Sequence, residues 1–219
     1  MKTVYLVRHG ESEVNVRNYT FGDEKSPLTA RGREQADRMA KRCAKLELDV
    51  IISSTMLRAQ ETAAAIVREN PVPLESHDLF VERKLPSILK DNDRYEEPLS
   101  SKRNAWLASF YLENERVEDG ENFPIIRERA GQVLSFLEHR SENNILVVAH
   151  GFILRMLLAR ILFGDEVTTE ELKRLMLRMR MDNTGISVLH YDAEGTEIYD
   201  NMPISGWSVR MWNDHAHLG

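Results

Sequence analysis

The residues best suited to chemistry in this 219-residue chain are two arginines and two histidines near the ends of short apolar segments. They are Arg8, His9, Arg58 and His150. Each apolar segment is rich in β-formers, which is typical of a buried strand. Because ligands bind at the carboxyl ends of the strands in open α/β sheets, we expect the four side chains to meet in one pocket.

Such a pocket would be strongly cationic and would suit a dianionic phosphoryl group. The planar guanidinium fork of arginine matches phosphate oxygens. Gly10 and Gly151 directly follow the two histidines, and we expect them to let backbone N–H groups approach the ligand closely. Helix N-termini after residues 54 and 151 would strengthen anion binding.

Histidine can also act as a covalent nucleophile. A neutral imidazole nitrogen would attack phosphorus in line with the leaving oxygen, while the pocket stabilises the equatorial oxygens. A carboxylic acid would protonate the leaving alkoxide and then activate water. The sequence has no serine or cysteine nucleophile motif and no acidic cluster with metal-ligand spacing, so we expect a reaction that needs neither metal nor cofactor.

Strand-like and helix-like segments alternate along the chain, which predicts an α/β fold, specifically a three-layer α/β/α sandwich with a mostly parallel central sheet. The expected strands are Lys2–Val7, Val50–Ser53, a short one within Pro73–Asp78, Ile145–Ala149, Ile186–Tyr191 and Thr196–Asn201, the last two joined by a turn at residues 192–195. The expected helices are Ala30–Leu46, a helix through Ala59–Val67, one from Ile126 through Leu137, one after Gly151 to Phe163, and Thr168–Arg180. Thr29 and the segment Ser53–Thr55 are the expected helix caps.

Residues 83–120 differ in character from the rest of the chain. They are charged, contain Pro86 and Pro98, and show weak periodicity. We interpret them as an insertion or lid subdomain over the main body of a single domain that spans residues 1–219. Substrate specificity is expected in this insertion and in the loop of residues 16–25.

Composition excludes several other classes of protein. Apolar residues make up 42% and charged residues 29%, as in an ordinary globular protein. The net charge of −6 gives no general attraction for nucleic acid or an anionic membrane. Cys43 is the single cysteine, which excludes an internal disulfide and fits a reducing compartment. No apolar run is long enough for a signal peptide or a membrane span, so we expect a cytoplasmic protein.

Five segments in order resemble the histidine phosphatase superfamily, and more narrowly its phosphoglycerate-mutase-like branch. They are Arg8-His9-Gly10-Glu11-Ser12 with Asn15, Ser26-Pro27-Leu28-Thr29 with Gly32 and Gln35-Ala36, Ser53-Ser54 with Leu57-Arg58-Ala59 and Glu61-Thr62-Ala63, Val147 to Gly151, and the ending Asn213 to Leu218. The resemblance covers nearly the whole chain.

The resemblance implies a role for each matching residue. His9 would be the nucleophile that accepts the phosphoryl group. The phosphoryl oxygens would be held by Arg8, Arg58 and His150, with Asn15, Gly22 and Gly151 as further contacts. Glu82 lies where the family places its proton donor. This chain departs from the common pattern directly after that glutamate, because Lys84-Leu85-Pro86-Ser87 replaces the family's Gly-x-Trp-Glu-Gly stretch. Glu75 and Asp78 therefore remain alternatives.

The insertion favours a phosphatase over a mutase. Mutases of this branch carry an Arg-Arg pair and a proline run in the insertion, and residues 83–120 contain neither. Asp119-Gly120-Glu121-Asn122 resembles the Gly-Glu-Ser segment of phosphatase members. The expected partner is a small phosphorylated metabolite, with phosphoglycerate mutase-type transfer or low-turnover binding of a phosphate ligand as alternatives. Related proteins are often dimers, which leaves a homodimer open.

Overall fold

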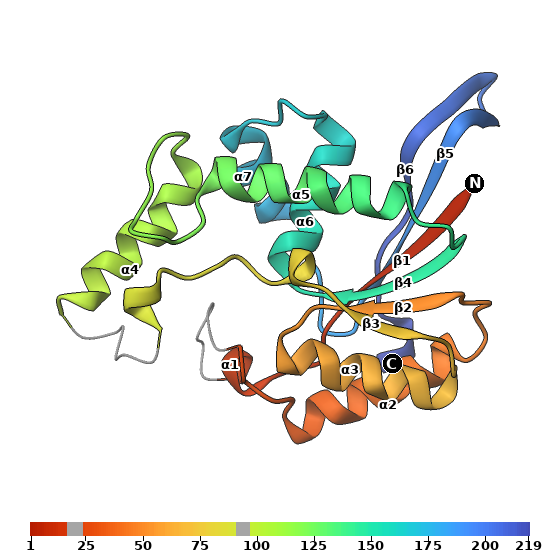
Figure 1. The fold of residues 1–219 in the computed structure, drawn as a ribbon, viewed down its shortest axis with the longest axis horizontal. Coiled ribbons are helices and arrows are strands. Elements are labelled where there is room, and N and C mark those ends of the chain that lie inside the picture. The colour runs from red at the N-terminus through yellow and green to blue at the C-terminus, as the bar shows by residue number, and fades with distance from the viewer. Residues whose placement is uncertain (17–23, 91–96) are drawn as a thin grey trace.

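The structure is a computed structural model and describes residues 1–16, 24–90 and 97–219. Within these residues, six strands form one sheet in the order β3-β2-β4-β1-β5-β6 (Figure 1). The strands are β1 (Lys2–Arg8), β2 (Val50–Ser53), β3 (Leu74–Ser76), β4 (Asn144–Ala149), β5 (Ile186–Tyr199) and β6 (Met202–Asp214). The first four in sheet order pair in parallel, and β5 and β6 are antiparallel. The prediction of an α/β fold with a mostly parallel central sheet is confirmed.

Helices cover both faces of the sheet because the strands are apolar on both sides. On one face, α2 (Ala30–Cys43) and α3 (Leu57–Glu69) pack on side chains such as Val7 and Ile51. On the other, α5 (Phe123–Glu138), α6 (Gly151–Phe163) and α7 (Thr169–Arg178) pack on the alternate residues, Leu6 and Ile52 among them. Cys43 is fully buried in the first of these two cores, as its place on the apolar stripe of its helix predicts.

The register of the parallel strands brings their carboxyl ends level. Arg8 at the end of β1 lies opposite Ala149 at the end of β4, and Val148 of β4 lies opposite Ser53 of β2. The residues that follow these strands, including His9 and His150, therefore emerge side by side from the same edge of the sheet. The short helix α1 (Glu13–Val16) lies just beyond β1.

Residues 83–90 and 97–120 lie on the side toward which the carboxyl ends of β1, β2 and β4 point (Figure 1). Their described part contains η2 (Ser87–Leu89), α4 (Leu99–Ala108) and η3 (Ser109–Tyr111). This segment has a small apolar cluster of its own, built on Leu85, Leu89 and Trp106. Arg83 attaches the cluster to the body of the protein, because its buried guanidinium lies 4.0 Å from the Trp106 ring centroid and donates to the Glu121 carbonyl.

Two expected local features are wrong. The Asp192–Gly195 segment is not a hairpin turn, because β5 continues through it with an irregular register between Asp192 and Glu197. The hairpin turns instead at Asp200 and Asn201, which both have positive φ, as a tight hairpin turn needs. The other error concerns α3, whose cap is Met56 without a side-chain bond rather than a residue of Ser53–Thr55. The expected cap of α2 is confirmed, since Thr29 accepts a hydrogen bond from the Gly32 N–H.

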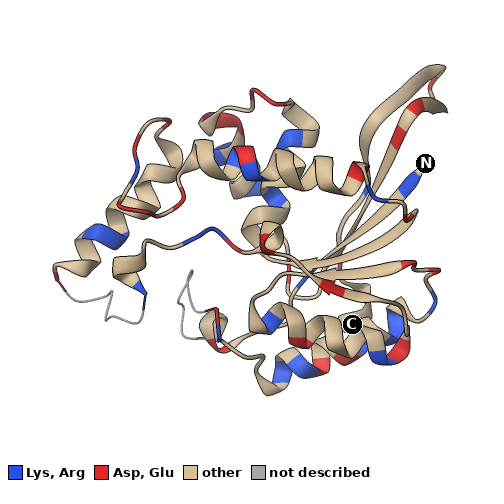
Figure 2. Ribbon diagram, in the orientation of Figure 1, with Lys and Arg blue, Asp and Glu red and all other residues tan. Residues whose placement is uncertain are grey.

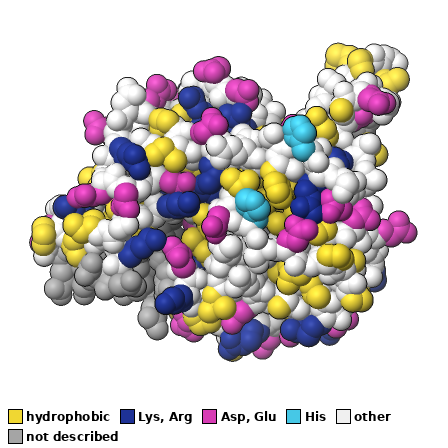
Figure 3. Space-filling model, viewed as in Figure 1, with side chains coloured by type: hydrophobic (Ala, Val, Ile, Leu, Met, Phe, Trp, Pro, Cys, Tyr) yellow, Lys and Arg dark blue, Asp and Glu magenta, His cyan; other side chains and the backbone are white. Residues whose placement is uncertain are grey.

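The β5–β6 hairpin projects beyond the rest of the sheet and carries exposed apolar side chains near its end (Figure 3). These are Ile198, Tyr199 and Met202.

Charges of both signs are mixed over the helices that cover the sheet (Figure 2). Among the described residues, no helix combines the length and the apolar character that crossing a membrane requires. The remaining short helices are η1 (Asp78–Phe80) and η4 (Ala216–Leu218).

Candidate active site

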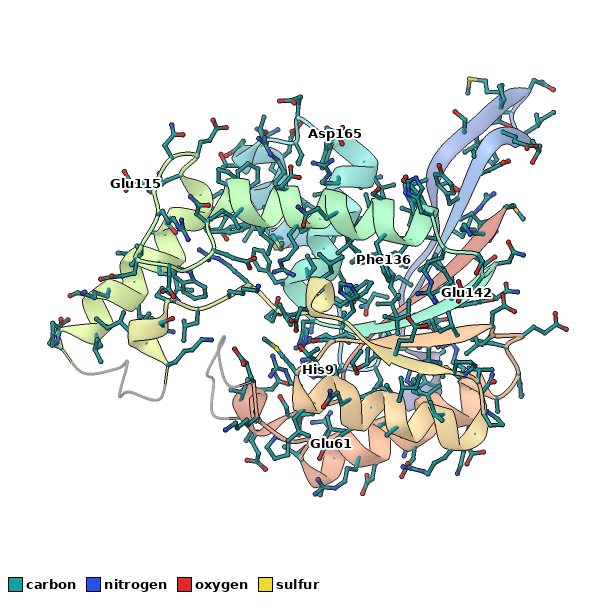
Figure 4. All side chains as sticks on the ribbon, in the orientation of Figure 1. His9, Glu61, Glu115, Phe136, Glu142 and Asp165 are labelled. Carbon is teal, nitrogen blue, oxygen red and sulfur yellow. The ribbon has the colours of Figure 1, made fainter. Side chains whose placement is uncertain are left out.

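His9 lies directly after β1, in the middle of the molecule (Figure 4), and is almost completely buried. Its Nδ1 lies 2.7 Å from the carbonyl oxygen of Gly10, and its Nε2 lies 3.1 Å from Nε of Arg58. A carbonyl oxygen only accepts and a guanidinium N–H only donates, so the proton of the neutral ring is on Nδ1. Nε2 therefore carries the lone pair and is the atom that can act as a nucleophile.

The surroundings of His9 keep its ring neutral. Burial lowers its pKa well below 6.5, and the nearby charges of Arg58 and Arg8 lower the pKa further. A neutral imidazole is the form that can attack phosphorus. The low pKa thus preserves the nucleophile at neutral pH, within a site whose fixed charges are positive.

The two predicted arginines approach His9 from different elements. Arg58, in the first turn of α3, is buried and donates from Nε to His9 and from Nη2 to the sulfur of Met56. Arg8, the last residue of β1, donates from Nη1 to the carbonyl oxygen of Met181, and its buried Nε has no partner among the described residues. An unpartnered N–H in a buried site is costly unless a ligand accepts from it.

His150 lies between β4 and α6, with its ring centroid 5.0 Å from that of His9. It is fully buried, and its Nε2 lies 2.8 Å from Oγ of Ser54. Its Nδ1 is also buried and has no partner among the described residues. Burial lowers the pKa of His150 well below 6.5, with Arg58 as the next contribution. The ring is therefore a neutral hydrogen-bonding group.

Glu82 reaches the same place from the segment after η1. One carboxylate oxygen accepts from the N–H of Arg83 at 3.0 Å, and the other accepts from the N–H of Phe152 at 3.2 Å, in the first turn of α6. The two alternatives lie elsewhere. Glu75 is exposed and forms an ion pair with Arg140, and Asp78 is exposed and accepts from the hydroxyl of Thr55. Of these three acids, Glu82 is the one that is buried, and its charge acts on Arg8.

Asn15 lies in α1, and its Oδ1 accepts from the backbone N–H of Ser12 at 3.0 Å. It also lies 3.4 Å from Nδ2 of Asn183, which donates to the carbonyl oxygen of His9 at 2.9 Å. The side-chain hydrogen bonds that Asn15 makes to described residues all use its Oδ1, so its side-chain amide N–H groups are the ones that could donate to a ligand. Gly22 lies outside the described residues.

The expected reason for the glycines is wrong for Gly10. Its N–H is not directed to a ligand, because it donates to Oγ1 of Thr62. A Cβ at Gly10 would lie 2.5 Å from the carbonyl oxygen of Gly32, so glycine is needed there for close packing of two backbones. A Cβ at Gly151 would lie 3.4 Å from Nε of Arg8. This is an ordinary van der Waals distance, so the packing at Gly151 does not itself require glycine.

Two residues that hold the site together, Asn183 and Arg129, were not predicted from the sequence. Asn183 fixes the backbone at His9, and Arg129 of α5 donates to the carbonyl oxygens of Leu79 and Val81, just before Glu82. Arg129 also forms a buried ion pair with Glu121. Asn183 belongs to a polar run before β5 that is typical of a turn, and no pattern in the sequence marks Arg129.

His217, close to the C-terminus, supports the backbone at Arg8. It is half-buried, and its Nε2 lies 3.1 Å from Oγ1 of Thr184, whose backbone N–H donates to the carbonyl oxygen of Arg8. Burial lowers the pKa of His217 to about 4.

The described residues contain no group of three or more His, Cys, Asp or Glu side chains that could hold a metal ion.

Comparisons with known proteins agree with this arrangement. The chain is 30% identical over 221 residues to the "Probable phosphoglycerate mutase GpmB" of Enterobacter sp. (strain 638), covering 100% of this chain and 95% of that protein. The solved structure of Bacillus stearothermophilus YhfR has a TM-score of 0.78 and 28% identity, with 100% of both chains covered. The alpha-ribazole phosphatase from Shigella flexneri has a TM-score of 0.74 at 24% identity, with 97% of this chain and 96% of that chain covered, and shares the fold. Residues 4–200 match the histidine phosphatase superfamily (branch 1), and the chain therefore belongs to that superfamily.

Proposed function

We propose that this protein is a phosphatase that hydrolyses a small phosphomonoester, without a metal ion, through a phosphohistidine intermediate on His9. The observation that carries the proposal is the state of the His9 ring. Its Nδ1–H is bonded to Gly10, its Nε2 lone pair faces Arg58, and burial keeps the ring neutral. Membership in the histidine phosphatase superfamily supports phosphoryl transfer as the reaction class.

In the first step, Nε2 of His9 attacks phosphorus, and the bond from phosphorus to the ester oxygen breaks. Arg58 donates from Nε to Nε2 of His9, so it has to turn this N–H toward a phosphoryl oxygen when the substrate binds. Hydrogen bonds of this kind commonly rearrange between the free and the substrate-bound enzyme. Arg8 and His150 supply further donors to the same oxygens, and such preorganised donors stabilise the charge that develops in the transition state.

Glu82 is proposed to act as the general acid of the first step and the general base of the second. Its carboxylic acid protonates the leaving alkoxide in the first step. In the second step its carboxylate takes a proton from water, which attacks phosphorus and breaks the bond to His9 Nε2, so that inorganic phosphate forms. The bond of Glu82 to the first turn of α6 and the action of its charge on Arg8 support this assignment over Glu75 and Asp78.

Mutase activity is the second candidate, because relatives such as the Enterobacter protein carry the name of a phosphoglycerate mutase. In a mutase the phosphohistidine would return its phosphoryl group to a substrate hydroxyl rather than to water. The insertion favours hydrolysis, because residues 83–120 lack the Arg-Arg pair and the proline run of the mutases that the sequence resembles.

The deciding experiment measures phosphate release from a panel of phosphomonoesters in excess EDTA. The panel includes an aryl phosphate, an alkyl phosphate and 3-phosphoglycerate, and a separate assay follows interconversion of phosphoglycerates with bisphosphoglycerate present. We expect release that survives EDTA and is abolished in His9→Ala. Glu82→Gln should reduce turnover of the alkyl ester more than that of the aryl ester, whose leaving group needs no proton. Interconversion that exceeds phosphate release would favour the mutase, and release that persists in His9→Ala would refute the phosphohistidine mechanism.

A further inference from the structure

We propose that Ser54 is a positioning residue that fixes the tautomer of His150, so that the Nδ1–H of this histidine faces the phosphoryl group. This inference rests on the proposed function for the identity of the ligand. The arrangement of protons at Ser54 and His150 follows from the structure of the site alone.

The hydroxyl of Ser54 has one donor and two acceptor positions. The backbone N–H of Met56 donates to Oγ of Ser54 at 3.2 Å, so one acceptor position is in use. The hydroxyl proton needs an acceptor, because Ser54 is completely buried. Among the described residues, the remaining side-chain contact of Ser54 Oγ is Nε2 of His150, at 2.8 Å. The hydroxyl therefore donates to Nε2.

A neutral histidine has one N–H, and its position decides what the ring can offer to a ligand. If Nε2 accepts from Ser54, the proton of His150 is on Nδ1. The opposite tautomer would leave two buried groups unsatisfied, namely the Ser54 hydroxyl proton and a bare lone pair on Nδ1. The Nδ1–H tautomer leaves a single buried group without a partner among the described residues, the Nδ1–H itself, and is therefore favoured.

The Nδ1 atom is where a donor is needed. It is buried without a partner among the described residues, in a ring whose centroid lies 5.0 Å from that of the nucleophile His9. Within the same part of the chain, Nε of Arg8 is the other buried donor of the site that has no partner. A phosphoryl group on His9 would satisfy both. With the opposite tautomer the Nδ1 lone pair would meet the anionic oxygens and repel them.

The neighbouring Ser53 provides a matched control. It is also completely buried at the end of β2, but its hydroxyl donates to the carbonyl oxygen of Ser54. Ser53→Ala and Ser54→Ala thus remove the same atom from adjacent buried positions. Ser54→Thr keeps the hydroxyl and tests whether it is the hydroxyl that matters.

The primary test is the tautomer of His150, measured by two-bond ¹H–¹⁵N correlation NMR of the full chain, with His150→Gln used to assign the ring. We expect a protonated Nδ1 and an unprotonated Nε2 in wild type and Ser53→Ala, and a shift toward the Nε2–H form in Ser54→Ala. A wild-type ring protonated at Nε2 would overturn the inference. This readout needs no turnover and gives an answer even if no ester is hydrolysed.

The second test measures binding of orthovanadate and inorganic phosphate to the same variants. We expect Ser54→Ala to weaken orthovanadate binding about 10- to 100-fold, as for loss of a hydrogen bond to a charged group. Ser53→Ala should change it less than about threefold, and Ser54→Thr should restore most of the loss. In a His150→Gln background, Ser54→Ala should have no further effect, because Ser54 acts through this ring. Equal and additive losses in both backgrounds would refute the positioning role.

The two tests separate this inference from the proposed function. If the tautomer is as expected but the protein neither binds orthovanadate nor hydrolyses an ester, the Ser54–His150 arrangement stands and the phosphatase proposal fails. If esters are hydrolysed through His9 but the His150 tautomer is insensitive to Ser54→Ala, the phosphatase proposal stands and this inference fails.

Discussion

Arg129 connects stability and catalysis in this fold, and its replacement by methionine is the most informative perturbation. Its guanidinium bonds both carboxylate oxygens of Glu121, at 2.8 and 2.7 Å, and donates to the carbonyl oxygens of Leu79 and Val81. These bonds hold the segment that carries Glu82 against α5. Methionine keeps much of the length and apolar volume of the side chain but removes the charge and its donors.

The cost of Arg129→Met follows from burial. The side chains of Arg129 and Glu121 are only 7% and 6% exposed, so the variant leaves a buried carboxylate without its counter-ion. Removing one partner of a buried pair costs about 3–5 kcal/mol. With a urea m-value of about 2 kcal/mol per molar, this shifts the unfolding midpoint down by roughly 1.5–2.5 M.

The assay is urea unfolding of Arg129→Met beside Arg174→Met, the same substitution at an exposed ion pair. Arg174 pairs with Glu170 one helical turn away, with both side chains more than half exposed. Pairs of that kind contribute about 0.3–0.5 kcal/mol. The double variant Arg129→Met, Glu121→Gln removes both charges of the pair and should be more stable than Arg129→Met alone, because the Glu121 carboxylate is then no longer buried without its ion-pair partner.

Turnover provides a second readout of the same variant. If Arg129 holds Glu82 in place, Arg129→Met should reduce hydrolysis of an alkyl phosphate more than that of an aryl phosphate, at a urea concentration well below its midpoint. An unfolding midpoint equal to that of Arg174→Met would refute the argument from burial. An equal loss with both esters would refute the link to Glu82.

Three further predictions concern other parts of the chain. Burial holds the pKa of His9 and His150 well below 6.5 in the folded protein, so below pH 6.5 the unfolded chain binds more protons than the folded one. The free energy of unfolding should therefore fall by about 1.4 kcal/mol for each ring with each unit that the pH is lowered. Urea midpoints at pH 7, 6 and 5 would measure this, and a midpoint that does not change with pH would contradict it. Burial raises the pKa of the Cys43 thiol to about 12, so iodoacetamide should label it only at the rate of unfolding, and rapid labelling under native conditions would be the contrary result. A Cβ at Gly32 would lie 1.8 Å from the carbonyl oxygen of Glu11. Gly32→Ala should therefore lower thermal stability and displace the backbone that follows His9, which changed ¹H–¹⁵N backbone signals would report. If the variant is as stable as the wild type, the backbone can relax around the added Cβ.

The parallel part of the sheet could be predicted because each of its strands and helices is marked by a pattern within its own short stretch of sequence. Short apolar runs mark β1, β2 and β4, and helical periodicity marks the segments between them. A general rule about strand ends then brings Arg8, His9, Arg58 and His150 together without knowledge of the packing. The structure places all four around one point, with Glu82 beside them.

The antiparallel hairpin was mispredicted because turn signals compete. Asp192 to Gly195 has turn-forming residues, but in the structure they make an irregularity within β5, where Asp192 accepts from Thr196 Oγ1. The true turn, Asp200-Asn201, needs two residues with positive φ, and asparagine and aspartate tolerate this better than most other residues. Which of two such signals ends a strand depends on pairing with β6, which lies further along the chain.

Contacts between distant side chains were beyond sequence reasoning. Asn183 reaches His9, Arg129 reaches Glu121 and the segment before Glu82, and Ser54 reaches His150. Each contact depends on which way a side chain points after the sheet and its helices have packed. Residue type and spacing alone carry no signal of that direction.

The pairing of β1 with β4 also determines how this protein must fold before it can act. His9 follows β1 and His150 follows β4, so most of the chain lies between two rings that end 5.0 Å apart. Closing so long a loop is slow compared with forming helices. Enzymatic activity should thus return late in refolding, after the helical circular dichroism signal, and a nascent chain should remain inactive until β4 has left the ribosome.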